Sequence, residues 1–337
     1  MKKKLLYIGN KLSKHGNTAT SIETLGSFLE EEGFTMYYAS SKKNQFLRML
    51  AMIITTCKLA KKVDYVLIDV YSTKNFWYAF VISQLCRILN LKYITKLHGG
   101  NLPNRLKRNP YLSDLIFINA YKITAPSSYL FECFSSRNYN NLLYIPNTIN
   151  ISKYDFTERK VTAPKLLWVR SLARIYNPIM AIKVLNEIKR EFPNAELCMV
   201  GPDKENIIQE CKDFANQHNV SVTFTGKLHK EAWVALSSEY TIFINTSRYD
   251  NTPVSIIEAM AIGLPVVSTN VGGIPYLLED KENALLVNND DVMGMAKAIQ
   301  LLINDATLTA MLIKNSRILV ETFDWQIVKH QWFDILK

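Results

Sequence analysis

The chain has 337 residues, of which 48% are hydrophobic, and this length and composition predict two domains with sizeable cores. Its five cysteines form no C-x-x-C pair, a pattern that argues against a disulfide framework or a zinc site and is typical of reduced thiols. The longest apolar stretches are too short or too interrupted to span a membrane, and the N-terminus turns polar too early for a signal peptide. We therefore expect a cytoplasmic protein.

The net charge of +10 is concentrated in the first half of the chain. Residues 1–150 carry 20 basic and 8 acidic side chains, a net charge of +12, whereas the remainder has a net charge of −2. Solvated surface lysines are one explanation. An asymmetry of this size also predicts an anionic partner, which could be a membrane surface, a lipid-linked phosphate or nucleic acid. Nucleic acid is the weakest of these, because no helix-turn-helix or basic–aromatic strand module stands out.

The first half alternates short apolar runs with amphipathic segments, a pattern that predicts repeated βα units. Strands are expected at 4–10, 35–40, 65–70 and 92–100, and helices at 20–33, 44–62 and 75–90. The segment 114–134 adds two strand-like pieces and a helix. Residues 142–156, with a Pro–Asn turn and polar residues, are expected to be a linker.

A second βα series follows the linker. Strands are expected at 165–171, 195–202, 222–226, 240–247, 264–270 and 284–290. Helices are expected at 178–192, 205–219, 229–239, 253–262 and 292–305. The aromatic-rich tail 323–336 has helical spacing and is expected to pack on the body of the protein. We therefore predict an α/β protein with doubly wound parallel sheets: an N-terminal domain over 1–156, a C-terminal domain over 157–320, and a helix over 321–337 that packs back toward the first domain. Two such domains facing one another would leave a cleft for a ligand.

The segment SRYDNTPVSIIEAMAIGLPVVSTNVGG, residues 247–273, carries two carboxylates around a helix start. Thr252 is a good N-cap and Pro253 suits the first helical turn. The helix should run through Ile262, and Gly263 should end it in a left-handed turn.

The two carboxylates, Asp250 and Glu258, then fall on either side of the helix start. Asp250 lies beyond the carboxyl end of a buried strand, the edge at which open α/β sheets bind ligands. Ser255 and Glu258 are three residues apart, so they share one side of the helix and could face a cleft.

Three further strand ends offer candidate ligand contacts. The loop GNKLSKHGNTAT has Gly9 and Gly16 before a helix and could bring backbone N–H groups to an anion or a sugar, although a plain βα loop would look the same. His98 ends a strand beside two glycines and is expected to contact a ligand rather than serve packing alone. The pair Gly272 and Gly273 follows another strand and could also allow close approach of a ligand.

Two arginines follow the first strand of the second domain. Guanidinium groups suit a diphosphate because their forked donors match phosphate oxygens. Arg170 sits at the strand end and Arg174 in the following loop, and either could instead be a surface residue. We favour Arg170.

No motif indicates a metal or a nucleotide-hydrolysing loop. The sequence has no D-x-D and no cluster of His and Cys ligands, and the adjacent Asp290 and Asp291 read as a helix-capping turn. G-x-S-x-G and the P-loop G-x-x-x-x-G-K are also absent, which argues against a serine hydrolase of that type or an NTPase. We expect no metal and no cofactor.

Taken together, these residues resemble the family 4 glycosyltransferases, which have the GT-B fold of two Rossmann-like domains. The strongest likeness is DNTPVSIIEAMAIGLPVVSTNVGGIP, which is similar to that family's E-x7-E region, proline–valine strand and glycine pair. PNTIN is similar to the usual Pro–Asn–Gly–Val–Asp linker segment, and LLWVRSLARIYNP, LCMVGP and VTFTG to the first strands of its donor domain.

The resemblance implies a retaining, metal-independent transfer of a sugar from a UDP- or GDP-type nucleotide sugar to a hydroxyl of a glycan or lipid-linked acceptor. It implies that Glu258 holds the ribose hydroxyls and that Asp250 contacts the donor sugar. His98 would touch that sugar from the other domain, and Arg170 or Arg174 would neutralise the diphosphate. The remaining implied donor contacts are the cleft-lining Gly16 and the backbone of Asn251, Thr252, Pro253, Val254 and Ser255.

The sequence departs from the family pattern at three places. The first carboxylate is Asp250 rather than Glu, one methylene shorter. Tyr176 and Asn177 replace the usual Lys–Gly pair, so the phosphate-binding lysine is missing. Tyr276 stands where a Glu commonly follows GGIP. These departures bear on the identity of the donor sugar and on which cation meets the diphosphate.

The family's biology implies a role in bacterial surface polysaccharide or lipopolysaccharide synthesis, with peripheral association on the inner face of the cell membrane. Two alternatives remain open at this point. A sugar-nucleotide epimerase or hydrolase could use the same fold. A non-catalytic module could bind anionic membranes through its first domain, although such a module has no use for the two carboxylates.

Overall fold

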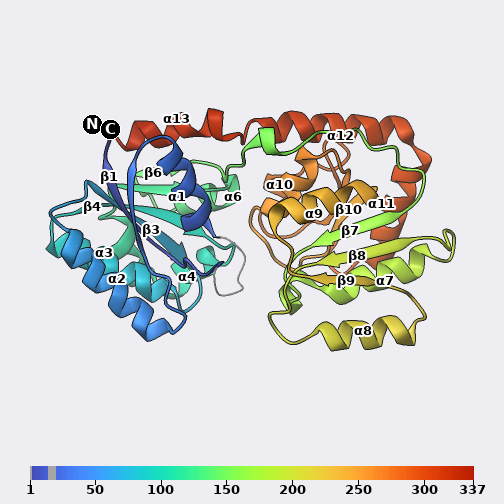
Figure 1. Ribbon diagram of the computed structural model, residues 1–337, viewed down its shortest axis with the longest axis horizontal. Coiled ribbons are helices and arrows are strands. Elements are labelled where there is room, and N and C mark those ends of the chain that lie inside the picture. Colours follow the sequence, from blue (N-terminus) through green and yellow to red (C-terminus); the bar gives the residue numbers. More distant parts are fainter. Residues whose placement is uncertain (1, 14–19) are drawn as a thin grey trace. The chain divides into compact units, whose positions relative to one another are not determined.

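The computed structural model describes residues 2–13 and 20–337, which form two compact units (Figure 1). The first unit runs to Thr148 and takes in Trp325–Lys337 from the end of the chain, and the second comprises Ile149–Asp324. These divisions lie a few residues from the domain limits expected at 156 and 320. The linker residues Ile149 and Tyr154 belong to the second unit because both are buried in its core.

The first unit is built on a parallel six-stranded sheet of order β2-β1-β3-β4-β5-β6. In chain order its elements are β1 (Lys4–Ile8), α1 (Ser21–Glu31), β2 (Thr35–Ala39), α2 (Gln45–Leu59), β3 (Tyr65–Tyr71), α3 (Phe76–Ile88), β4 (Lys92–His98), α4 (Leu102–Arg108), α5 (Pro110–Phe117), β5 (Lys122–Ala125), α6 (Ser128–Ser135), β6 (Leu142–Tyr144) and, from the end of the chain, α13 (Trp325–Ile335). The strand order reverses direction between β1 and β3, and this reversal makes a switch point at their carboxyl ends.

Helices cover both faces of this sheet. One face packs against α2, α3, α5 and α6, and the other against α1 and α13. Trp325 and Trp332 of α13 are buried against the second face, with Trp325 stacked on Phe28 at 5.0 Å between ring centroids. The last helix therefore completes the core of the first unit, beside α1 (Figure 1).

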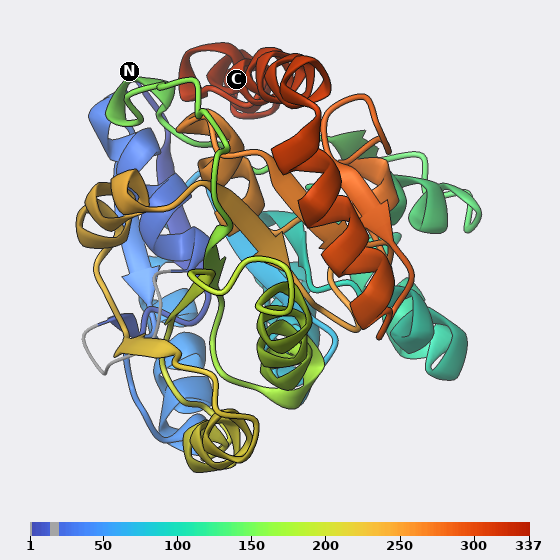
Figure 2. The same cartoon turned by 90° about the vertical axis from the view of Figure 1, so that its right-hand side faces the viewer.

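The second unit repeats the architecture with a parallel sheet of order β12-β11-β10-β7-β8-β9. Its elements are β7 (Lys165–Val169), α7 (Pro178–Ile188), β8 (Glu196–Val200), α8 (Ile208–Gln217), β9 (Thr223–Gly226), α9 (Lys230–Leu236), β10 (Ile242–Asn245), α10 (Val254–Ala261), β11 (Val266–Thr269), β12 (Leu285–Val287), α11 (Val292–Asn304) and α12 (Ala306–Glu321). Here the order reverses between β7 and β10, the arrangement of dinucleotide-binding folds. Helices α7 and α11 lie side by side on one face of the sheet (Figure 2), and α9 and α10 cover the other.

These two parallel sheets confirm the predicted α/β class, but several elements differ from the expectation. Helix α4 was not predicted, and β6 is a sheet strand within the segment that was expected to be a linker. The run DLIF, expected to be a strand, ends helix α5, because a short apolar run does not by itself distinguish a strand from a buried helix. Helix α12 was not predicted as a separate element. Its start is marked by Asp305, whose side chain accepts a hydrogen bond from the backbone N–H of Leu308 at 2.9 Å.

Within the described residues, no single helix is long and apolar enough to cross a membrane. The helices α11 and α12 meet the length and composition criteria only when taken together, and they meet at an angle of 102°.

Candidate functional site

The predicted donor-binding residues of the second unit gather where its strand order reverses. Arg170 directly follows β7, and Asp250 lies in the loop after the neighbouring strand β10. Their side chains form an ion pair in which a terminal guanidinium nitrogen of Arg170 donates to Asp250 Oδ2. The other carboxylate oxygen of Asp250 accepts the backbone N–H of Asn251 at 2.9 Å. The topology therefore brings together two residues that lie 80 positions apart in the sequence.

Arg170 provides a shielded positive charge at this point. Its side chain is only 17% exposed, and its guanidinium lies over the Tyr176 ring at 4.8 Å. Burial lowers the pKa of Arg170 from its usual value, while Tyr176 and Glu258 oppose that shift. Arginine nevertheless stays protonated in proteins. Its buried Nε has no hydrogen-bond partner among the residues that the structure describes, so a donor is left for a ligand.

Lys204 is a second cation near Arg170 that the sequence did not suggest. It follows β8, and its backbone N–H donates to the carbonyl of Leu172 at 3.1 Å, which ties it to the loop after Arg170. Burial lowers the pKa of Lys204, and the charges of Arg170 and Lys227 lower it further. Like charges held this close favour an anionic ligand.

The helix α10 begins one residue later than expected. Pro253 is its N-cap rather than part of its first turn, and Thr252 lies before the cap. The end of the helix is as predicted, with Gly263 in the left-handed region at φ 83°. The hydroxyl oxygens of Thr252 and Ser255 are buried without a partner among the described residues. Together with the first N–H groups of the helix, they form a set of unused donors beside Asp250.

Glu258 is almost fully buried and already has two partners. Its Oε1 accepts hydrogen bonds from the Tyr154 hydroxyl at 2.8 Å and from Lys230 Nζ at 2.6 Å. Its side chain is 6% exposed, whereas that of Lys230 is 43% exposed, so the lysine can withdraw into water more easily than the carboxylate can. Burial and the negative charge of Glu258 both raise the pKa of Tyr154, so its hydroxyl stays protonated and donates.

The glycine pair after β11 allows a close approach, as expected, and the group it approaches in the structure is the backbone of the Asp250 loop. A Cβ at Gly273 would lie 2.5 Å from the carbonyl oxygen of Asn251, and one at Gly272 would overlap the carbonyl of Asp250. The Gly273 N–H donates to that Asp250 carbonyl at 2.9 Å. The missing side chains therefore let this turn hold the Asp250 loop in place.

The other predicted arginine points to a different place. Arg174 is 65% exposed and pairs with Glu210 of α8 at 2.7 Å. It lines a cavity of about 360 Å³ with Asn177, Lys183, Arg248 and Asp290. Arg248 and Asn177 both bond to Asp290, so most of the charges of this cavity are already paired with one another. Asp291 caps α11 through the Gly294 N–H at 2.7 Å, which confirms the predicted capping turn.

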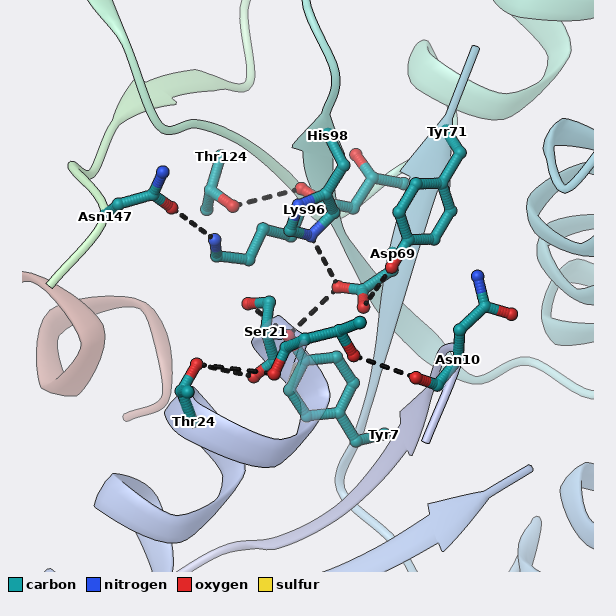
Figure 3. Close-up of polar contacts among 12 residues, drawn as sticks. Tyr7, Asn10, Ser21, Thr24, Asp69, Tyr71, Lys96, His98, Thr124 and Asn147 are labelled. Carbon is teal, nitrogen blue, oxygen red and sulfur yellow. Dashed lines mark hydrogen bonds and ion pairs between the residues drawn. The ribbon is translucent and has the colours of Figure 1, made fainter. Parts of the chain in front are cut away.

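A separate polar cluster occupies the switch point of the first unit (Figure 3). Its centre is Asp69 of β3, whose side chain has no solvent exposure. Asp69 accepts hydrogen bonds from His98 Nε2 at 2.8 Å, from the Tyr7 hydroxyl at 3.0 Å and from the Tyr71 hydroxyl at 3.2 Å. Gly9 is required beside it, because a Cβ there would lie 2.6 Å from Asp69 Oδ2.

This cluster fixes the orientation and tautomer of His98. The ring stacks on Tyr71 with centroids 5.1 Å apart. Burial lowers the pKa of His98, Asp69 opposes that shift and Lys96 reinforces it, so the neutral ring is favoured. A carboxylate can only accept, so the neutral ring donates from Nε2 and leaves Nδ1 as an acceptor. Such an acceptor can receive a sugar hydroxyl.

The predicted cleft-lining Gly16 lies outside the described residues. Arg48 of α2 is buried, and its guanidinium donates to Asn10 Oδ1 at 2.7 Å and to the carbonyls of Lys42 and Lys43. Among residues 2–13 and 20–337, no three His, Cys, Asp or Glu side chains come together as metal ligands would.

Sequence reasoning missed Tyr154, Lys230, Lys204 and Asp69. The first two lie 104 and 28 positions from Glu258 and carry no local signal that would link them to it. Asp69 could have been found, since it is a lone carboxylate inside the apolar strand YVLIDV, and a buried charge needs partners.

Comparison with known proteins agrees with this geometry. Residues 151–318, nearly the whole second unit, match the family of glycosyl transferases group 1, and this match supports a glycosyltransferase. An uncharacterized glycosyltransferase of Haemophilus influenzae is 30% identical over 158 residues, which cover 46% of this chain and 44% of that protein. One from Methanocaldococcus jannaschii is 22% identical over 95% of this chain and 90% of that protein. The chain spans less than half the length of most of the curated relatives that match it best, this archaeal protein being an exception.

Solved structures extend the likeness to the whole chain at the level of the fold. Sucrose-phosphate synthase from Thermosynechococcus elongatus superimposes with a TM-score of 0.80 at 18% identity, covering 99% of this chain and 98% of its own. Anabaena HepE in complex with UDP and glucose has a TM-score of 0.80 at 17% identity, with 99% of both chains covered. The fold is therefore that of the GT-B glycosyltransferases.

The contact from Tyr154 to Glu258 gives a first prediction. Tyr154→Phe removes one donor from a buried carboxylate, so it should lower the free energy of unfolding of the second unit by about 1.5–3 kcal/mol. Thermal or urea unfolding followed by tryptophan fluorescence measures this change. Tyr111→Phe, at an exposed phenol of the first unit, is the control and should change nothing. Equal stability of Tyr154→Phe and the native protein would show that the hydrogen bond does not hold Glu258.

Proposed function

We propose that this protein transfers a sugar from a UDP- or GDP-type nucleotide sugar to a hydroxyl of a glycan or lipid-linked acceptor. The observation that carries the proposal is the group of unused donors and cations around the start of α10. Buried Arg170, neighbouring Lys204 and the unpartnered hydroxyls of Thr252 and Ser255 all favour an anion with several oxygens. A nucleoside diphosphate has this chemistry, and a helix N-terminus at a switch point is where such a group binds in α/β folds.

Glu258 is the proposed ribose ligand and Asp250 the proposed contact of the transferred sugar. A carboxylate with two acceptor oxygens can receive two neighbouring hydroxyls. Glu258 lies inside the helix and is held by Tyr154, whereas Asp250 lies outside the helix and is held by Arg170. The lysine missing from the family's usual position has a substitute in Arg170, with Lys204 as an additional cation.

We further propose that the transfer retains the configuration of the sugar and that the departing phosphate accepts the proton. Both motif carboxylates are ion-paired, which makes either a poor nucleophile. In the proposed step the bond from the anomeric carbon to the diphosphate oxygen breaks, the bond to the acceptor oxygen forms on the same face, and the acceptor's hydroxyl proton passes to the diphosphate. Arg170 and the helix donors stabilise the charge that develops on the leaving group.

The two carboxylates should respond differently to neutral substitutions. Glu258→Gln weakens an acceptor of hydrogen bonds that are each worth roughly 1.5–3 kcal/mol, so it should reduce affinity for both the bare nucleoside diphosphate and the intact donor. Asp250→Asn should leave nucleoside diphosphate affinity nearly unchanged and lower turnover of the donor. Calorimetric titration with UDP, GDP and their sugars, beside initial rates, separates the two effects.

The control for this pair is a third carboxylate of the second unit, which lies away from the proposed donor site. Asp290→Asn, in the separate cavity of the second unit, should change neither affinity nor rate. If Asp250→Asn and Glu258→Gln both fold and transfer sugar at the native rate, the pair is structural and the transferase proposal fails. Conversion of the donor in the absence of any acceptor would favour an epimerase or hydrolase instead.

Metal independence is part of the proposal, since arginine, lysine and helix donors supply the positive charge that a metal would otherwise provide. Sugar transfer should therefore proceed at an unchanged rate in excess EDTA. Loss of turnover that returns only on addition of Mg²⁺ or Mn²⁺ would contradict this expectation.

Association with an anionic membrane is the last part of the proposal, and α2 is its proposed surface. One side of this helix exposes large apolar side chains, and lysines lie at both of its ends. The exposed apolar residues are Phe46 (76%), Leu47 (53%), Leu50 (44%) and Ile54 (44%), and the exposed cations are Lys42, Lys43, Lys58, Lys61 and Lys62. An apolar stripe flanked by lysines suits the interface of an acidic bilayer.

Binding to vesicles tests this surface. The protein should sediment with vesicles containing phosphatidylglycerol but not with neutral phosphatidylcholine vesicles, and salt should weaken the binding, since each cation near the surface contributes about 1 kcal/mol. Phe46→Ser with Leu47→Ser should abolish sedimentation. Ile327→Ser, at a residue of α13 that is 54% exposed, is the matched control. Equal sedimentation with both kinds of vesicle would rule out an electrostatic membrane surface.

A further inference from the structure

Lys96 of β4 is a buried cation without a carboxylate partner. The residue is only 5% exposed, and its Nζ bonds to Asn147 Oδ1 at 3.2 Å. Within the described residues, no Asp or Glu oxygen lies within ion-pair distance of it. A lysine that is buried this deeply is normally paired, because loss of hydration is costly for a charge.

The nearest carboxylate is already committed to other donors. Asp69 is the register partner of Lys96 on the adjacent strand, but its oxygens receive His98, Tyr7 and Tyr71 (Figure 3). Asp69 therefore influences Lys96 only through space. The ammonium keeps N–H donors that these neighbours do not use.

Asn147 adds further donors beside the ammonium. Its Oδ1 accepts from Lys96, so its amide N–H₂ group is turned to other partners, and none is found among the described residues. Figure 3 shows the Lys96 side chain extending away from Asp69 toward Asn147. The Lys96 ammonium and the Asn147 amide together offer more donors than acceptors, and the ammonium is charged. This combination matches an oxyanion and not a cation or an apolar group.

We propose that Lys96 and Asn147 bind an oxyanion, a phosphate or a carboxylate, that the acceptor substrate carries. The proposal rests on the proposed sugar transfer, because it assigns the acceptor to the first unit and makes that acceptor a negatively charged molecule. The anion would complete the coordination of the ammonium and place the acceptor beside His98, whose Nδ1 is free to receive a hydroxyl.

The protonation of Lys96 supports this assignment. Burial lowers the pKa of Lys96 to about 8, against the opposing influence of Asp69. The titratable groups that share its cluster are Asp69, His98, Tyr7 and Tyr71. An anion bound to Nζ favours the charged form and raises this pKa, so binding at pH 8.5 should take up a proton. As the pH rises further through the pKa of the bound form, the anion should be released.

Calorimetry with inorganic phosphate and with L-malate tests the proposal and distinguishes the two kinds of oxyanion. The native protein should bind at least one of them, with proton uptake at pH 8.5 revealed by buffers of different ionisation enthalpy. Lys96→Met should weaken that binding at least tenfold and abolish the proton uptake. Lys92→Met, at the exposed start of the same strand, should behave like the native protein.

A second variant keeps the test valid if Lys96→Met fails to fold. Asn147→Asp places a carboxylate against the ammonium, so it should preserve the fold and abolish anion binding. Binding of nucleoside diphosphate, measured on the same samples, should survive both substitutions. If the native protein itself does not bind nucleoside diphosphate, that result would instead count against the proposed function.

Three results would overturn the proposal. The native protein could fail to bind phosphate and malate, or Lys96→Met could bind them as tightly as the native protein does. Alternatively, Arg170→Met and not Lys96→Met could remove the binding, which would place the anion in the second unit.

Discussion

The ion pair between Arg170 and Asp250 joins the ends of the two strands at which the second sheet reverses its order. Parallel strands leave diverging loops at such a point, and something must hold those loops close enough to share one ligand. A buried ion pair is costly unless both charges are satisfied, so the surrounding backbone must fit it closely. Gly201 allows β8 to pass the Arg170 carbonyl, and Gly272 and Gly273 press on the Asp250 loop. These three glycines are therefore best explained by the close packing of the loops that carry the ion pair.

The loops at the switch point of the first unit must also be held close together, and a different set of charges lies there. At its switch point a buried carboxylate, Asp69, is surrounded by donors, whereas in the second unit a buried guanidinium lies among unused donors. Asp69 accepts the hydrogen bonds that Tyr7, Tyr71 and His98 donate, and it fixes the His98 ring. Lys96 is left as the charge of the cluster without a carboxylate partner. Both switch points therefore have an excess of donors: the ammonium of Lys96 in the first unit and the guanidinium of Arg170 in the second. Part of the +12 net charge of residues 1–150 is thus buried inside the fold as Lys96, and part lies on the exposed lysines beside α2.

Residue patterns predicted the order of strands and helices well, because each element buries an apolar face whose period is written in neighbouring residues. They failed where a run was short, as at the DLIF end of α5. At the site, Asp250, Glu258, Arg170 and His98 could be singled out because each lies at or just beyond a strand end or a helix start. Tyr154, Lys230 and Lys204 could not, since their positions depend on tertiary contacts between distant segments. The identity of a residue's partner is a property of the fold, not of the local pattern.

The partners found here also suggest why both motif carboxylates are ion-paired before any ligand arrives. Glu258 is only 5% exposed, so its carboxylate loses most of its hydration, and the Tyr154 hydroxyl and Lys230 offset that cost. Lys230 pairs with Glu258, and because its own side chain is 43% exposed, under the proposed function it would leave at little cost when hydroxyls replace it. Arg170 cannot leave in this way, being 17% exposed and stacked on Tyr176. Under the proposed function, Asp250 would therefore contact the sugar with Arg170 still attached, which limits how far its carboxylate can reach.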